Sequence, residues 1–70
     1  MEPRPGKYRH YKGNYYEVLG VARHTETEEL MVVYRALYGD RELWVRPHHM
    51  FLETVTRSDG QEMLRFQAVE

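Results

Sequence analysis

Aromatic and basic residues in the middle of the chain have the side chains needed to hold an anionic ligand or a protein segment. A tyrosine and an arginine are adjacent in one apolar stretch, and a tryptophan and an arginine lie close together in the next. A guanidinium donates strong hydrogen bonds to carboxylates and phosphates, and aromatic rings offer faces for stacking. Together with a polar loop nearby, these aromatic and basic residues predict a binding surface. It is made of Trp44, Arg35, Arg46, Tyr34, His24 and Glu26.

Basic residues interleaved with tyrosines near the N-terminus indicate an alternative, which is binding of RNA or single-stranded nucleic acid. Tyrosine rings can stack on bases while basic side chains neutralise phosphates. However, the chain has 10 basic and 11 acidic residues and a formal net charge of −1 with neutral histidines. We favour this partner less, because nucleic-acid binders usually carry a basic excess. The residues it would use are Lys7, Tyr8, Arg9, Tyr11 and Lys12.

Signals for catalysis or metal binding are weak. His24 and Glu26 have the His-x-Glu spacing of zinc deaminases, which also need a Pro-Cys-x-x-Cys element, and the chain has no cysteine. His48 and His49 are adjacent, and neighbouring residues on a strand point to opposite faces. We expect no catalytic residue, no metal and no cofactor. A small hydrolase or transferase using His24 and Glu26 is the second alternative.

Length and composition limit the architecture. Seventy residues form one domain, and the absence of cysteine excludes disulfides and fits a reducing compartment. No apolar run is long enough to cross a bilayer, so we expect a cytoplasmic protein without membrane contact, as a monomer or a weak homo-oligomer. Two early prolines predict a flexible arm over residues 1–5, and the single domain then covers residues 6–70.

The pattern of aromatic, β-branched and turn residues predicts short strands with tight connections. Gly20 inside the second strand indicates a bulge or a sharp bend at a barrel corner, and the segment after Pro47 is expected to form one turn of 3₁₀ helix. The expected strands cover residues 6–11, 15–23, 30–38, 42–46, 52–57 and, as an edge strand, 62–68.

The connection at Gly39-Asp40 sets which side chains share a face. A two-residue turn places Arg35 opposite Trp44, with the guanidinium over the indole. A three-residue loop instead pairs Tyr34 with Arg46, and a slip of one residue exchanges the two faces of the strand. We expect the two-residue turn. The two arginines then need a carboxylate, exposure to water or an anionic partner.

Four segments in order carry a resemblance to a known family: GKYRHYKG at 6–13, YEVLGVARHTET at 16–27, VYRALY at 33–38 and WVRP at 44–47. Together they resemble a small bacterial family of uncharacterised proteins, catalogued as a domain of unknown function. The resemblance implies an SH3-like barrel and a bacterial origin, and it supplies no activity, cofactor or site residue.

The strands and the resemblance together predict an all-β fold, a small SH3-like barrel of five or six antiparallel strands with one 3₁₀ turn near residues 47–51. The expected function is that of a non-catalytic binding module. Its expected partner is a protein segment or an anionic small ligand.

Overall fold

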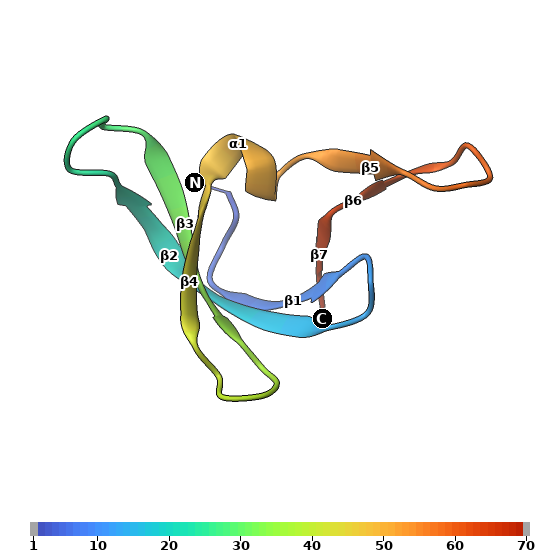
Figure 1. The fold of residues 1–70 in the computed structure, drawn as a ribbon, viewed down its shortest axis with the longest axis horizontal. Helices are drawn as coiled ribbons and strands as arrows, with labels where there is room; N and C mark the ends of the chain where they lie inside the picture. Colours follow the sequence, from blue (N-terminus) through green and yellow to red (C-terminus); the bar gives the residue numbers. More distant parts are fainter. Residues whose placement is uncertain (1, 70) are drawn as a thin grey trace.

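The computed structural model describes residues 2–69, which form an open antiparallel sheet, a separate hairpin and one helical turn (Figure 1). The larger sheet has the strand order β4-β3-β2-β1-β7, and β5 pairs with β6. The elements are β1 (Gly6–His10), β2 (Tyr15–Arg23), β3 (Leu30–Ala36), β4 (Leu43–Pro47), α1 (His48–Phe51), β5 (Thr54–Thr56), β6 (Glu62–Leu64) and β7 (Phe66–Ala68).

The predicted all-β fold is confirmed in part, since the described chain is mostly β, but it differs from the prediction in two ways. Within residues 2–69 the five-stranded sheet does not close into a barrel, because β4 and β7 are its two edges. The turn after Pro47 is a single turn of α-helix instead of 3₁₀. Met1 of the expected arm and Glu70 of the expected domain lie outside the described residues.

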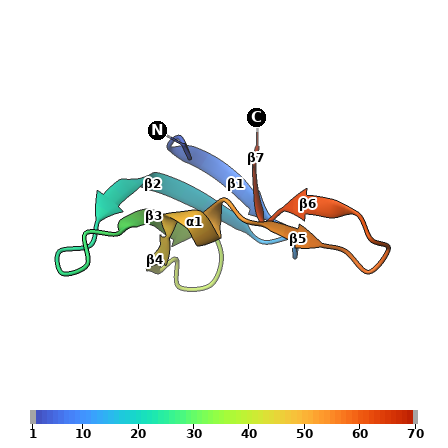
Figure 2. The same cartoon turned by 90° about the horizontal axis from the view of Figure 1, so that it is seen from above.

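Gly20 marks a β-bulge, as its sequence position predicts. Val18 lies opposite Tyr34 and Gly20 lies opposite Val33, so β2 has one more residue than β3 at this point. The additional residue, Leu19, is exposed. A bulge increases the local twist of a strand. In both views the 24–29 turn projects from one end of the molecule and the β5–β6 hairpin from the other (Figures 1 and 2).

The core lies on one face of the five-stranded sheet, where α1 covers it. The helical turn contributes Phe51, which is 2% exposed. Its ring stacks on that of Phe66 from β7, with centroids 4.1 Å apart and ring planes 4° from parallel. The sheet contributes Tyr8, Val18, Val32 and Tyr34. Large aromatic rings allow a short chain to bury enough apolar area to fold.

The expected strand over residues 62–68 is in fact two strands in different sheets, and that prediction is wrong. The chain bends at Arg65, whose N–H donates to the carbonyl of Glu53 (3.0 Å) and whose carbonyl accepts from Tyr11 N–H (2.9 Å). The Arg65 guanidinium also donates to the Glu53 carboxylate (2.7 Å). These contacts turn β7 away from the hairpin and onto β1, where Phe66 lies opposite His10.

Residues 2–5, for which the sequence predicts a flexible arm, contact the folded domain. Pro3 is buried. The imidazole Nε2 of His48 lies 2.6 Å from the carbonyl oxygen of Glu2, and the hydroxyl of Tyr8 donates to the carbonyl of Arg4 at 2.9 Å. The segment therefore lies next to β1 and α1.

Neither of the two registers predicted for β3 and β4 occurs. Tyr34 lies opposite Trp44, and Arg35 lies opposite Leu43. The connection is wider than a two-residue turn, because the bond from Ala36 N–H to the carbonyl of Glu42 leaves residues 37–41 between the paired strands. Within it, Gly39 and Arg41 have positive φ (57° and 54°). Trp44 therefore shares a face with Tyr34, and the predicted stacking of the Arg35 guanidinium on the indole is wrong.

Candidate binding surface

Within residues 2–69, no strand pairs with the outer edge of β4, and its backbone groups there are left without a strand partner. Ala36 N–H donates to the carbonyl of Glu42 (3.1 Å), which fixes the hydrogen-bonding phase of the β3–β4 pair. In an antiparallel ladder such bonded pairs alternate. Trp44 and Arg46 therefore direct their backbone groups towards β3, whereas Leu43 and Val45 direct theirs away from the sheet.

Three consecutive apolar side chains on this edge are exposed. The exposed fractions are 55% for Leu43, 49% for Trp44 and 59% for Val45. Natural edge strands are usually protected by charged residues, prolines or bulges. In β4 the protecting types come only at its end, with Arg46 and Pro47.

A shallow hollow of about 150 Å³ lies beside Trp44, next to the β3–β4 connection. Its walls include Ala36, Tyr38 and Glu42 together with the loop residues between them. It opens on the face of the sheet that carries the core. The indole therefore has space beside it for an apolar or aromatic group.

Arg46 lies on the same face and is only partly engaged by the protein. Its Nε donates to the Tyr34 hydroxyl at 3.3 Å, and its guanidinium carbon lies 5.5 Å from the centre of the Phe66 ring. Among residues 2–69 no carboxylate forms an ion pair with it. Its two terminal nitrogens are available to an acceptor from outside the chain.

A cluster of tyrosines continues this face towards β2. The Tyr16 ring packs edge-on against Tyr34, Tyr38 and Phe66. Its hydroxyl lies 2.9 Å from that of Tyr38. Burial, followed by the hydrogen bond to Tyr38, raises the pKa of Tyr16 to about 12. The hydroxyl therefore stays neutral at physiological pH and serves as a hydrogen-bonding group.

His10 borders the same cluster from β1. Its ring centroid lies 4.9 Å from that of Phe66. Burial is the largest cause that lowers the pKa of His10, and the positive charges of Arg46, Arg65 and Lys12 lower it further. An excess of positive charge thus surrounds this part of the face.

The other predicted site residues are not brought to this surface. Arg35 lies on the opposite face, next to Glu17 on β2, and donates to the carbonyl of Arg41 at 2.8 Å. His24 and Glu26 are exposed in the turn before β3, at the opposite end of that strand from the β3–β4 connection. The Nδ1 atom of His24 accepts from the backbone N–H of Glu26 at 3.1 Å. That bond stabilises the turn, and the open position gives no water-poor pocket for catalysis.

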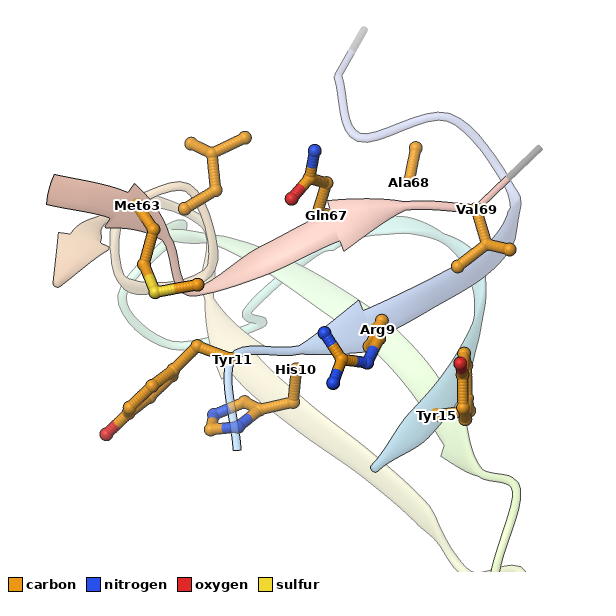
Figure 3. A pocket seen from close by; sticks show the side chains of 9 residues that line it. Arg9, His10, Tyr11, Tyr15, Met63, Gln67, Ala68 and Val69 are labelled. Atoms are coloured by element: carbon orange, nitrogen blue, oxygen red, sulfur yellow. The ribbon is translucent and has the colours of Figure 1, made fainter. Parts of the chain in front are cut away.

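The β1–β2 hairpin borders a separate hollow of about 260 Å³ between β1 and the β6–β7 segment. Figure 3 shows Arg9, Tyr15 and Val69 at one end of the hollow and Tyr11 with Met63 at the other. Two residues of the nucleic-acid alternative, Arg9 and Tyr11, line this hollow.

The remaining residues of that alternative are less accessible to bases. Tyr8 belongs to the core and is 9% exposed, so its ring cannot stack on a base. The Lys7 ammonium lies over the Tyr15 ring at 4.7 Å. The Lys12 ammonium lies 5.8 Å from the centre of the Tyr11 ring. The stacking faces of both rings are thus partly covered.

Sequence reasoning missed the contribution of Leu43 and Val45. The signal was present, because three apolar residues in a row occur directly before an arginine and a proline. Only the strand order identifies that run as an edge. Among residues 2–69, no three histidine, aspartate or glutamate side chains gather as metal ligands. The same residues contain no helix with the length and apolarity required to span a bilayer.

These features define a small, mostly β domain with an open sheet edge and an adjoining aromatic and basic face. The sequence profile of a family described as "Protein of unknown function (DUF1653)" matches residues 6–68. The chain therefore belongs to the DUF1653 family.

A solved structure supports the same relationship. The chain is similar to a DUF1653 protein from Bordetella bronchiseptica, with 43% sequence identity and a TM-score of 0.87. The alignment covers 97% of this chain and 88% of the other. No curated protein matches the chain.

Proposed function

We propose that this protein is a non-catalytic binding module that takes up an extended protein segment along the free edge of β4. One observation carries the proposal: Leu43, Trp44 and Val45 are consecutive, exposed and apolar on an edge strand. Such an edge offers both unpaired backbone groups and apolar contact area. Addition of a strand from a partner satisfies both at once.

The backbone of β4 limits how much of a partner can pair. Leu43 and Val45 each offer one outward N–H and one outward carbonyl, as derived from the Ala36–Glu42 bond. Pro47 has no N–H, so the donor row ends there. A segment of a few residues therefore suffices to fill the edge.

The side chains favour a partner with a carboxylate among apolar residues. On one face Trp44 has a hollow beside it, and Arg46 has terminal nitrogens with no acceptor in the described chain. A carboxylate accepts two parallel hydrogen bonds from a guanidinium. On the other face, Leu43 and Val45 offer contact to β-branched side chains.

A proline substitution tests the role of the edge. Val45→Pro removes an N–H that points away from β3, and proline is tolerated on edge strands in that orientation. Val45→Thr keeps the N–H and is the matched control. The probes are peptides of about eight residues without tryptophan, selected from a random display library on the wild-type protein.

Binding is measured by the fluorescence of Trp44, which is the single tryptophan of the chain. We expect peptides rich in acidic and β-branched residues to shift the emission to shorter wavelength. Val45→Pro should weaken their binding about fivefold or more, because it removes a backbone hydrogen bond worth about 1 kcal/mol and adds a steric clash. Val45→Thr should change it little.

Two results would overturn the proposal. One is the failure of any peptide to be enriched, and the other is equal binding to the proline and threonine variants. The nucleic-acid alternative is checked in parallel with oligouridylate. One outcome is that the probe binds with a steep loss of affinity in salt and that Val45→Pro has no effect on its binding. That result would instead favour a nucleic-acid site on the β1–β2 hairpin.

A further inference from the structure

We infer that β4 of one chain pairs in antiparallel fashion with β4 of a second copy, with Trp44 opposite Trp44 on the two-fold axis. This inference rests on the proposed function, because it names the segment that occupies the edge. Two five-stranded sheets would then become one continuous sheet across the dimer.

The hydrogen-bonding phase of β4 permits this register. Leu43 and Val45 have outward backbone groups, and Trp44 between them does not. With Trp44 at the centre, Leu43 of one copy lies opposite Val45 of the other. Each such pair exchanges both of its hydrogen bonds, whereas the two Trp44 residues form a non-hydrogen-bonded pair. The register therefore follows the alternation that an antiparallel ladder requires.

The charges on both sides of Trp44 are complementary in the same register. Glu42 of one copy lies opposite Arg46 of the other, and the two-fold axis repeats this pair. Within residues 2–69 neither Glu42 nor Arg46 forms an ion pair inside the chain. Opposite charges across strands favour pairing, and like charges oppose it. When two copies of the segment Glu42–Arg46 pair in antiparallel fashion, each residue therefore lies opposite a residue of compatible charge or polarity.

Charge exchange tests the pairing by sedimentation over a range of protein concentrations. The wild type should shift with concentration from 8.5 kDa towards twice that mass. Glu42→Arg should weaken the dimer about tenfold or more, because it creates a like-charge pair twice. The double variant Glu42→Arg with Arg46→Glu should restore it. Glu62→Arg, with the same charge change on β6, is the control and should leave the dimer unchanged.

A single introduced cysteine tests the register even if Arg46→Glu disturbs folding. The chain has no cysteine. In non-hydrogen-bonded antiparallel pairs the Cα atoms are about 4.5 Å apart, which suits a disulfide. Trp44→Cys should therefore cross-link to its own copy under mild oxidation. Leu43→Cys and Val45→Cys should do so much less, since neither lies opposite itself.

The outcomes separate this inference from the proposed function. A wild type that stays monomeric up to millimolar concentration, or a dimer indifferent to both Glu42→Arg and Val45→Pro, overturns the self-pairing. Equal cross-linking of the three cysteine variants overturns the register. In each case the selected peptides still test the proposed function, because the comparison of their binding to Val45→Pro and Val45→Thr does not depend on a second copy of the chain.

Discussion

Tyr34 and Trp44 lie directly opposite each other on neighbouring strands, yet Tyr34 is 4% exposed and Trp44 is 49% exposed. Tyr34 sits between β2 and β4, with Phe51 and Phe66 packed against its ring. Trp44, in the part of the chain that the structure describes, has a neighbouring strand on one side only. The same face of the sheet thus passes from core to open surface within one cross-strand pair.

We expect Trp44→Ala to cost little stability and Tyr34→Ala to cost much. Removing a half-exposed ring from an edge should lower the free energy of unfolding by about 1 kcal/mol, whereas truncating a buried aromatic costs about 3–5 kcal/mol. Urea unfolding followed by circular dichroism checks both variants. An unfolded Trp44→Ala protein would assign Trp44 to the core and contradict the binding surface.

Phe51→Ala should unfold the protein under ordinary conditions. Phe51 is the core residue supplied by α1, and its ring stacks on Phe66. The expected loss of about 3–5 kcal/mol equals the whole stability of about 3–5 kcal/mol typical of a domain this small. Met50→Ala on the same turn is the control, because Met50 is exposed. Thermal melts that show a cooperative transition for Phe51→Ala near the wild-type midpoint would refute the role of α1 as the cover of the core.

Alkaline solution should destabilise the fold through Tyr16. Its folded pKa of about 12 lies above the ordinary value of 10.0. The neutral hydroxyl is thus favoured in the folded state, so this contribution is complete below pH 10 and is lost as the pH rises towards 12. Urea midpoints measured along that interval should fall less steeply for Tyr16→Phe. Part of the slope should persist, because burial also raises the pKa of Tyr8.

Acid solution should also destabilise the fold, in this case through His10. Burial lowers the folded pKa of His10 below its ordinary value of 6.5, so its contribution to stability is present above that value and is lost as the pH falls through the folded pKa. An NMR titration of the imidazole should give a midpoint below 6.5. Arg46→Ala should raise the midpoint only in part, since burial is the larger cause. A midpoint unchanged by that substitution would separate His10 from the surface that contains Arg46.

Local sequence signals predicted much of this protein. Alternating apolar residues placed β1, β2 and β3 near their observed positions, and Gly20 marked the bulge because a glycine inside a strand lacks a side chain to pack. Residue type alone led to the prediction that Trp44 and Arg46 form part of a binding surface, and both residues lie on the edge strand β4. Each of these features depends on residues that are close together in the sequence.

Tertiary structure decided the register, the bend at Arg65 and the position of the edge. The β3–β4 connection contains a positive φ at Arg41, a conformation that the presence of an arginine in the sequence does not predict. The bend at Arg65 depends on bonds to Glu53, which is distant in the sequence. Alternation fixes which side chains of one strand share a face, but which residues of the neighbouring strand lie on that face follows from long-range pairing. For that reason only the folded sheet separates the buried Tyr34 from the exposed Trp44.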